Sequence, residues 1–434
     1  MKQLDPIRRA AAHTAAVLAF LALSTSAQAA PPDVRTRAEL RNAVRGPDAT
    51  RGVLTDVTRG VLRVAPAKVQ LRRTPTNETP KQTTNETTTI RARADQRLRA
   101  GDRRGALADY ERVVQRQTSD PALWQLVGDL RAHFGSVDTA VAAWRSASAL
   151  RPEDDRILER VTHGSIQLGD YATAAEFQAR LVAVLMDSTG GPGSERNLRR
   201  HMVNLAELAA LAGDFTRGEQ AALQLIGRAP HAIDGHLALG YVQLHAGDFD
   251  DAEGTYLEVL KRDPNVTIAL NNLGNIRYMR RDLDGAAELF ETILGVEGAS
   301  PYSMSIATSN LAELLQIQGG FDDASRLYKD AINLVPTGAW SYMGLAALLD
   351  MEGRYDAATD AMIDGWERDK NRLSRLNSHF YEEEWAWQRD ALIAEIEGDT
   401  DLAASLWTRV LAGDVELLTA SAAYHLRTLG ESKP

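Results

Sequence analysis

Histidines and carboxylates are the side chains of this sequence best suited to catalysis or to metal binding. Three of the nine histidines, His231, His236 and His245, lie close together in the sequence. No carboxylate stands at metal-ligand spacing from them, and His236 and His245 are nine residues apart, so they do not share a tight helical face. His379 and Glu383 are one helical turn apart, but one pair is a weak signal. The sequence therefore predicts no metal site and no cofactor.

Nucleophilic and phosphate-binding chemistry is equally poorly represented. The chain has no cysteine, so thiol catalysis and thiolate metal sites are excluded. It contains no G-x-S-x-G, no P-loop and no glycine-rich dinucleotide turn. The glycine-rich run at 190–193, GGPG, does not follow a predicted strand. We therefore predict no catalytic residue and no enzyme activity, and we look to binding for the function.

Small residues return along the chain at a step of about 34 residues. Glycine stands at 101, 135, 169, 213, 247, 319, 353 and 398, and Arg281 fills the missing place. Alanine or glycine stands five residues after each of these nine positions, and an aromatic residue often follows one helical turn later. Glycine can end a helix in the left-handed conformation, and alanine lets two helices approach closely. The pattern predicts all-α units of two antiparallel helices, none of which can bury its apolar face alone.

The pattern closely resembles the tetratricopeptide repeat (TPR) family. The matching residues are Trp124, Gly128, Ala140, Trp144, Ala147 and Pro152 in one unit, and Leu239, Gly240, Ala252, Tyr256 and Pro264 in another. The resemblance implies a solenoid of stacked antiparallel helix pairs, wound as a TPR-like right-handed superhelix. We expect about nine repeats and a capping helix.

The repeat register also predicts how the chain is divided. We expect TPR units 1–3 in residues 87–188, a Gly/Pro-rich break at 189–198, and units 4–9 in residues 199–417. Insertions fall near 301–304 and 373–383. Residues 418–434 are expected to form the capping helix and a tail.

In the family that the chain resembles, the first helix of each unit lines a concave groove that holds the partner. The resemblance places seven polar and aromatic residues there: Asn204, Tyr241, Asn272, Asn275, Tyr278, Asn310 and Trp340. Asparagine amides donate and accept hydrogen bonds together, and aromatic side chains supply contact area with few rotors to freeze. These residues are our candidates for binding a protein or peptide partner. The alternative is that the asparagines are solvated or join adjacent helices to each other.

Some family members use groove asparagines with lysine or arginine to clamp a C-terminal carboxylate. Asn275 and Asn310 stand at two of the asparagine places of such a clamp. Asn271, Trp340 and Gly344 stand where its basic residues would be. The departure argues against a carboxylate clamp in this chain.

Residues 1–30 have the pattern of a cleaved bacterial signal peptide. Lys2, Arg8 and Arg9 precede the apolar run at 15–24, and the small residues of SAQAA follow it. Ten apolar residues cannot cross about 30 Å of hydrocarbon as a helix, and no later stretch is long enough to be a transmembrane segment. We therefore expect a periplasmic or secreted protein.

A basic N-terminal arm is expected at residues 31–73, followed by a polar flexible linker at 74–89. Residues 31–100 hold 15 basic and 7 acidic residues, whereas residues 101–434 hold 31 basic and 51 acidic. The acidic array argues against a nucleic-acid partner, because phosphate binding needs a basic face. The arm could serve self-association, by docking on the acidic array, or contact with an anionic surface.

The sequence favours a non-catalytic exported scaffold that binds an extended segment of a partner protein in its groove. Envelope, pilus, secretion and polysaccharide-export assemblies all use such repeat arrays, and the sequence does not choose among them. The alternatives are a subunit of an envelope enzyme complex and a protein that binds an anionic surface through its basic arm.

Overall fold

The computed structural model describes residues 80–116, 119–187, 192–369 and 383–431, and this part of the chain holds nineteen helices and no strand. The helices up to the break are α3 (Pro80–Arg99), α4 (Arg103–Arg116), α5 (Pro121–His133), α6 (Val137–Leu150), α7 (Asp155–Gln167) and α8 (Tyr171–Asp187). The middle of the array is α9 (Pro192–Leu211), α10 (Phe215–Arg228), α11 (Asp234–Ala246), α12 (Phe249–Arg262), α13 (Thr267–Met279) and α14 (Leu283–Gly295). The last helices are α15 (Pro301–Ile317), α16 (Phe321–Leu334), α17 (Ala339–Met351), α18 (Tyr355–Arg368), α20 (Glu383–Glu397), α21 (Thr400–Leu411) and α22 (Glu416–Glu431).

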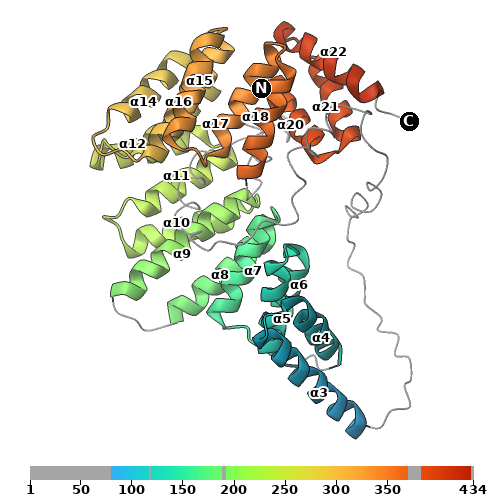
Figure 1. Ribbon diagram of the computed structural model, residues 1–434. Coiled ribbons are helices and arrows are strands. Elements are labelled where there is room, and N and C mark those ends of the chain that lie inside the picture. The colour runs from blue at the N-terminus through green and yellow to red at the C-terminus, as the bar shows by residue number, and fades with distance from the viewer. Residues whose placement is uncertain (1–79, 117–118, 188–191, 370–382, 432–434) are drawn as a thin grey trace.

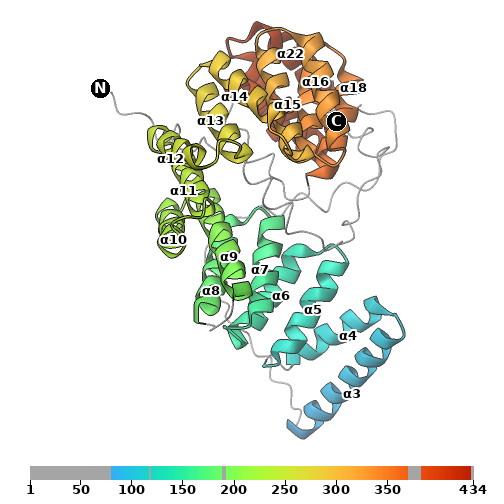
Figure 2. The same cartoon turned by 90° about the vertical axis from the view of Figure 1, so that its left-hand side faces the viewer.

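These helices form nine antiparallel pairs, from α3 with α4 to α20 with α21, and α22 packs against the last pair as a cap. Figures 1 and 2 show the pairs stacked in chain order, from α3 at one end of the array to α22 at the other. Each pair packs on the next through its helix faces, so each unit completes the core of its neighbour. The predicted all-α solenoid of helix pairs is confirmed.

The turn inside each pair depends on one residue with left-handed backbone. All eight glycines that the repeat register selected have positive φ, and Arg281 takes the same conformation with φ of 63°. Arg281 is the one residue other than glycine with positive φ in the described part of the chain. The repeat step therefore marks the helix ends even where the residue type changes, because the turn needs this backbone geometry.

Close packing within a pair depends on a glycine that lies under an aromatic ring. A Cβ atom added to Gly128 would lie 2.4 Å from the Trp144 ring, and one added to Gly274 would lie 2.4 Å from the Phe290 ring. The ring needs the space that a side chain on the first helix would fill. This contact explains why small residues recur seven positions before the turn.

Extra residues lengthen particular first helices. The PYSM insertion forms the first turn of α15, where the Ser300 hydroxyl accepts a hydrogen bond from the Ser303 amide and Pro301 occupies the first helical position. The expected break at 189–198 becomes helical from Pro192, so α9 has 20 residues. Helix α3 likewise begins at Pro80, within the expected linker. Thr87 and Ile90 are buried there, and packing against the array overrides the polar composition.

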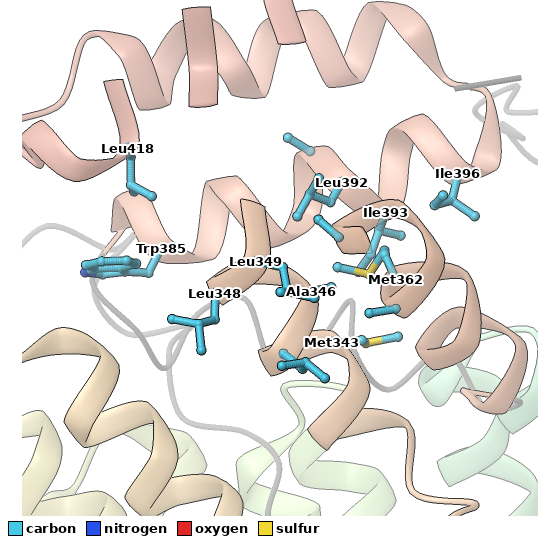
Figure 3. Close-up of a cluster of buried hydrophobic side chains, with 14 of the residues drawn as sticks. Met343, Ala346, Leu348, Leu349, Met362, Trp385, Leu392, Ile393, Ile396 and Leu418 are labelled. Carbon is cyan, nitrogen blue, oxygen red and sulfur yellow. The ribbon is translucent and has the colours of Figure 1, made fainter. Parts of the chain in front are cut away.

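The largest apolar cluster lies in the C-terminal units, where α17 is enclosed by its neighbours. Figure 3 shows Met343, Leu348 and Leu349 of α17 near Leu392 of α20 and Leu418 of α22. Helix α17 touches α20 and α22 as well as its own partner α18. The first helices therefore close on one another at this end of the array. The predicted signal peptide, the predicted basic arm and residues 74–79 lie outside the described residues.

Candidate functional site

The predicted groove residues lie on the first helices α9, α11, α13, α15 and α17, and the structure places them in different surroundings. Tyr241, Asn272 and Asn310 are buried, with exposed fractions of 2%, 1% and 8%. Asn204 and Asn275 are partly exposed. The groove candidates thus divide into side chains inside the helix packing and side chains that solvent can reach.

The two buried asparagines join helices to each other. The Asn272 amide of α13 donates to the Tyr256 hydroxyl of α12 over 2.8 Å. The Asn310 amide of α15 donates to the Asn271 carbonyl oxygen of α13 over 2.9 Å. Both bonds satisfy buried polar groups, which would otherwise destabilise the fold.

Trp340 and Tyr278 belong to a cluster that Arg389 of α20 completes. The Arg389 guanidinium lies 4.5 Å from the centre of the Trp340 ring and 3.6 Å from the Glu313 carboxylate. Burial raises the pKa of Tyr278, and the Glu313 charge raises it further. The inner face of these four units is therefore filled by the chain's own charged and aromatic side chains.

Asn204 lies in a different setting, an open cleft between α7, α8 and α9. The polar side chains that line it are Glu159, Thr162, His163, Gln178, His201, Asn204 and Glu207. Its apolar lining is Ile166, Leu208 and Leu211. It combines apolar and hydrogen-bonding groups around about 20 Å³, which is room for one small group.

The charges around this cleft are mainly acidic. Glu207 is 8% exposed, and burial raises the pKa of its carboxyl to about 8. Burial and then the nearby Arg200 lower the pKa of His201 to about 4, so its ring is neutral at pH 7. The Gln178 amide donates to the His201 carbonyl and lies 3.0 Å from its Nδ1. Glu159 stands 3.7 Å from the other ring nitrogen.

A second polar cluster, among α17, α20, α21 and α22, is fully occupied by its own members. His425 of α22 lies 2.8 Å from both the Asp350 and the Glu395 carboxylates. Burial alone would lower the pKa of His425, but the hydrogen bonds that its ring donates to the two carboxylates outweigh burial and raise the pKa to about 9. The Ser421 hydroxyl and the Gln388 amide also donate to Asp350. This cluster fixes the cap onto α17.

Sequence reasoning missed Glu207, Glu159 and Arg389. Glu207 stands 34 residues before Tyr241, so the same repeat step could have marked it as an inner-face residue. Arg389 follows an insertion, and the repeat register gave no sign that it would reach α15 and α17. In the described residues no group of three histidines, cysteines or carboxylates could hold a metal ion. None of the described helices is long and apolar enough to cross a membrane.

Comparison with known proteins gives a family and no named relative. A sequence profile described as "Tetratricopeptide repeat" matches residues 91–155 and 237–303. No curated protein matches the sequence. The solved structures similar to this one include a tetratricopeptide repeat protein from Parabacteroides merdae, with 12% identity, a TM-score of 0.40, and coverage of 66% of this chain and 99% of that chain.

Two further solved structures have the same kind of similarity. Pseudomonas aeruginosa pilF has 18% identity and a TM-score of 0.35, and the match covers 52% of this chain and 97% of that chain. Yeast Tom70 has 13% identity and a TM-score of 0.29, with 80% and 96% covered. At this similarity none of them indicates a partner. The two matched segments, the 34-residue register and the nine helix pairs of the described residues together support a tetratricopeptide repeat protein.

Proposed function

We propose that this protein is an exported, non-catalytic scaffold that holds an extended segment of a partner protein along the inner face of its first helices. TPR proteins are protein-interaction scaffolds, and the open cleft between α7, α8 and α9 carries the proposal for this chain. Asn204 is partly exposed in this cleft, and Asn275 is partly exposed further along the inner face. Amides at both places could bond the backbone of an extended segment without reading its sequence.

The two buried asparagines have a supporting part in this proposal. Asn310 joins the first helices α15 and α13, Asn272 joins α13 to the second helix α12, and the Tyr241 ring lies 3.8 Å from that of His245. Tyr278 and Trp340 contribute the partly exposed aromatic surface beside Arg389. Buried hydrogen bonds thus fix the helices that form the groove, and the exposed residues of the groove would contact the partner.

A capture experiment tests the scaffold. We expect the purified chain to retain a protein partner from an extract of the source envelope, and Asn204→Ala combined with Asn275→Ala to weaken capture at least tenfold. Asn333→Ala is the matched control, because Asn333 is an exposed asparagine on the second helix of a pair. Equal capture by the double variant and the control would place the partner outside the groove.

Export and the lack of catalysis are separate parts of the proposal. The N-terminal pattern supports export, and N-terminal sequencing of the protein from its source should begin near residue 30. Incubation with cell-wall and polysaccharide substrates should give no turnover. A product released by the wild-type chain would favour the enzyme-subunit alternative.

A further inference from the structure

We propose that the cleft between α7, α8 and α9 holds a cationic side chain, arginine or lysine, of the extended partner segment, between the carboxylates of Glu207 and Glu159. This inference rests on the proposed function and names the chemistry that the groove would recognise at this place. An acidic cleft is the opposite of a carboxylate clamp, which would need basic residues.

The buried carboxyl of Glu207 is the first observation that carries the proposal. It lines the cleft, is more than nine-tenths buried, and receives no hydrogen bond from any group in the described part of the chain. Burial is the sole cause of its raised pKa, which agrees with the lack of a donor. Its oxygens are not among the fully enclosed atoms without a partner, so they open onto the cleft, where a donor that enters the cleft can bond them.

The second observation is another buried group beside it. The hydroxyl of Tyr241, on α11, is buried and has no hydrogen-bond partner. Burial raises the pKa of Tyr241, and the Glu207 charge raises it further, so the two groups lie within electrostatic reach. A guanidinium carries five N–H donors in a planar fork, enough to bond both oxygens of a carboxylate.

The charges that face the cleft from its surrounding elements favour a cation. Glu159 of α7 adds a second carboxylate, and the His201 ring is neutral. Arg200 is exposed and donates to Asn197. Of the described residues, two glutamates and no lysine or arginine line the cleft.

Two short peptides on the full-length chain test the proposal by calorimetry. The probe is Ac-Gly-Ser-Ala-Arg-Ala-Ser-Gly-amide, and its neutral match carries citrulline in place of arginine. We expect the arginine peptide to bind at least tenfold more tightly than the citrulline peptide. In Glu207→Gln this preference should fall about tenfold. Glu176→Gln, an exposed glutamate of α8 outside the cleft, should keep it.

The pH dependence of peptide affinity distinguishes a Glu207 that binds the ligand from a Glu207 with a purely structural role. With a carboxyl pKa of about 8, about a tenth of Glu207 is ionised at pH 7 and about nine tenths at pH 9. Affinity for the arginine peptide should therefore rise about tenfold between these values in the wild type. It should stay flat in Glu207→Gln. Burial lowers the pKa values of His201 and His163 below the usual value for histidine, so neither imidazole changes its charge over this range.

The outcomes separate this inference from the scaffold proposal. Equal binding of both peptides, no binding of either, or an unchanged preference in Glu207→Gln would overturn the cationic site. Capture of a partner that is sensitive to the asparagine variants but not to Glu207→Gln would retain the scaffold and reject only this inference. A photocrosslinker in place of His163 identifies the occupant. Crosslinks to residues 31–73 would show that the occupant is the chain's own basic arm and that no separate partner is needed.

Discussion

Two regions on the inner face of this molecule are built from the same helix pairs but differ in how their polar groups are satisfied. Around α17, α20 and α22 the buried carboxylates of Asp350 and Glu395 enclose His425. Around α7, α8 and α9 the carboxyl of Glu207 faces an open cleft without a donor. The repeat therefore sets which residues face the inner side of the array. The spacing between neighbouring units decides whether other residues of the chain supply hydrogen-bond partners for them.

The two regions differ in how closely their first helices lie to helices of neighbouring units. Helix α17 contacts α15, α20 and α22, so its inner side chains meet groups from other units. At the break, α8 packs closely on α9, and residues of α7, α8 and α9 line the cleft.

The largest expected effect comes from breaking the closed region. His425→Ala would leave Asp350 and Glu395 buried without their shared partner, and we expect it to lower the free energy of unfolding by about 3 kcal/mol. Urea unfolding followed by circular dichroism measures this. His231→Ala, an exposed loop histidine, is the control. If both variants unfold at the same urea concentration, the cluster does not hold the cap.

The closed region should also respond to pH. The pKa of His425 is raised in the folded state to about 9, above its unfolded value of about 6.5. Its contribution is therefore fully present below pH 6.5 and is lost as the pH rises through about 9. Unfolding measured from pH 6 to pH 10 should show this decline in the wild type. The decline should be reduced in His425→Ala, and equal slopes in both proteins would contradict it.

The open region should respond to pH over a lower window. The pKa of Glu207 is raised to about 8 in the folded state, so its carboxyl ionises in the unfolded chain first, near pH 4.5. The free energy of unfolding therefore falls as the pH rises from about 4.5 through 8. Glu207→Gln removes this loss, and we expect it to be more stable than the wild type at pH 8 by about 2 kcal/mol. Thermal unfolding at pH 5 and pH 8 checks the difference. A less stable glutamine variant at pH 8 would mean that the carboxylate already has a partner.

Glycine substitutions compare close packing within a pair with close packing between pairs. A Cβ on Gly128 would lie 2.4 Å from Trp144 of the same pair, and one on Gly344 would lie 2.4 Å from Tyr328 of the preceding pair. We expect Gly128→Ala and Gly344→Ala each to destabilise the fold by about 1–2 kcal/mol. Gly254→Ala, with open space around its Cβ, should be neutral or slightly stabilising. Thermal unfolding measures all three, and a loss at only one of Gly128 and Gly344 would show that one kind of contact relaxes around the added methyl group.

The smallest expected effect lies at the turn between α13 and α14. Arg281 holds a left-handed backbone that glycine adopts without strain, so Arg281→Gly should raise the free energy of unfolding by up to about 1 kcal/mol. Differential scanning calorimetry resolves such a shift. The same exchange at Arg280, which has negative φ, should destabilise the helix end instead. A destabilised Arg281→Gly would show that its side-chain contacts outweigh the backbone strain.

Much of the fold could be predicted because each repeat position has one physical task. The helix ends followed from the left-handed turn, and the pair packing from alanine and glycine beneath aromatic rings. The surroundings of the inner face could not be predicted in the same way. Asn272 and Asn204 have the same side chain on equivalent faces, yet one bonds Tyr256 and the other faces a cleft. That difference depends on how neighbouring units are spaced, which the insertions alter without a local signal.

The bonds from α22 to Asp350 have a consequence for the order in which the chain assembles. Most contacts in the array join neighbouring helices and can form soon after those helices are made. His425 and Asp350 are 75 residues apart, so their hydrogen bond can form only after nearly all of the C-terminal helices have been made. The last units should therefore exchange their amide hydrogens as one cooperative block, while units before the break open one after another.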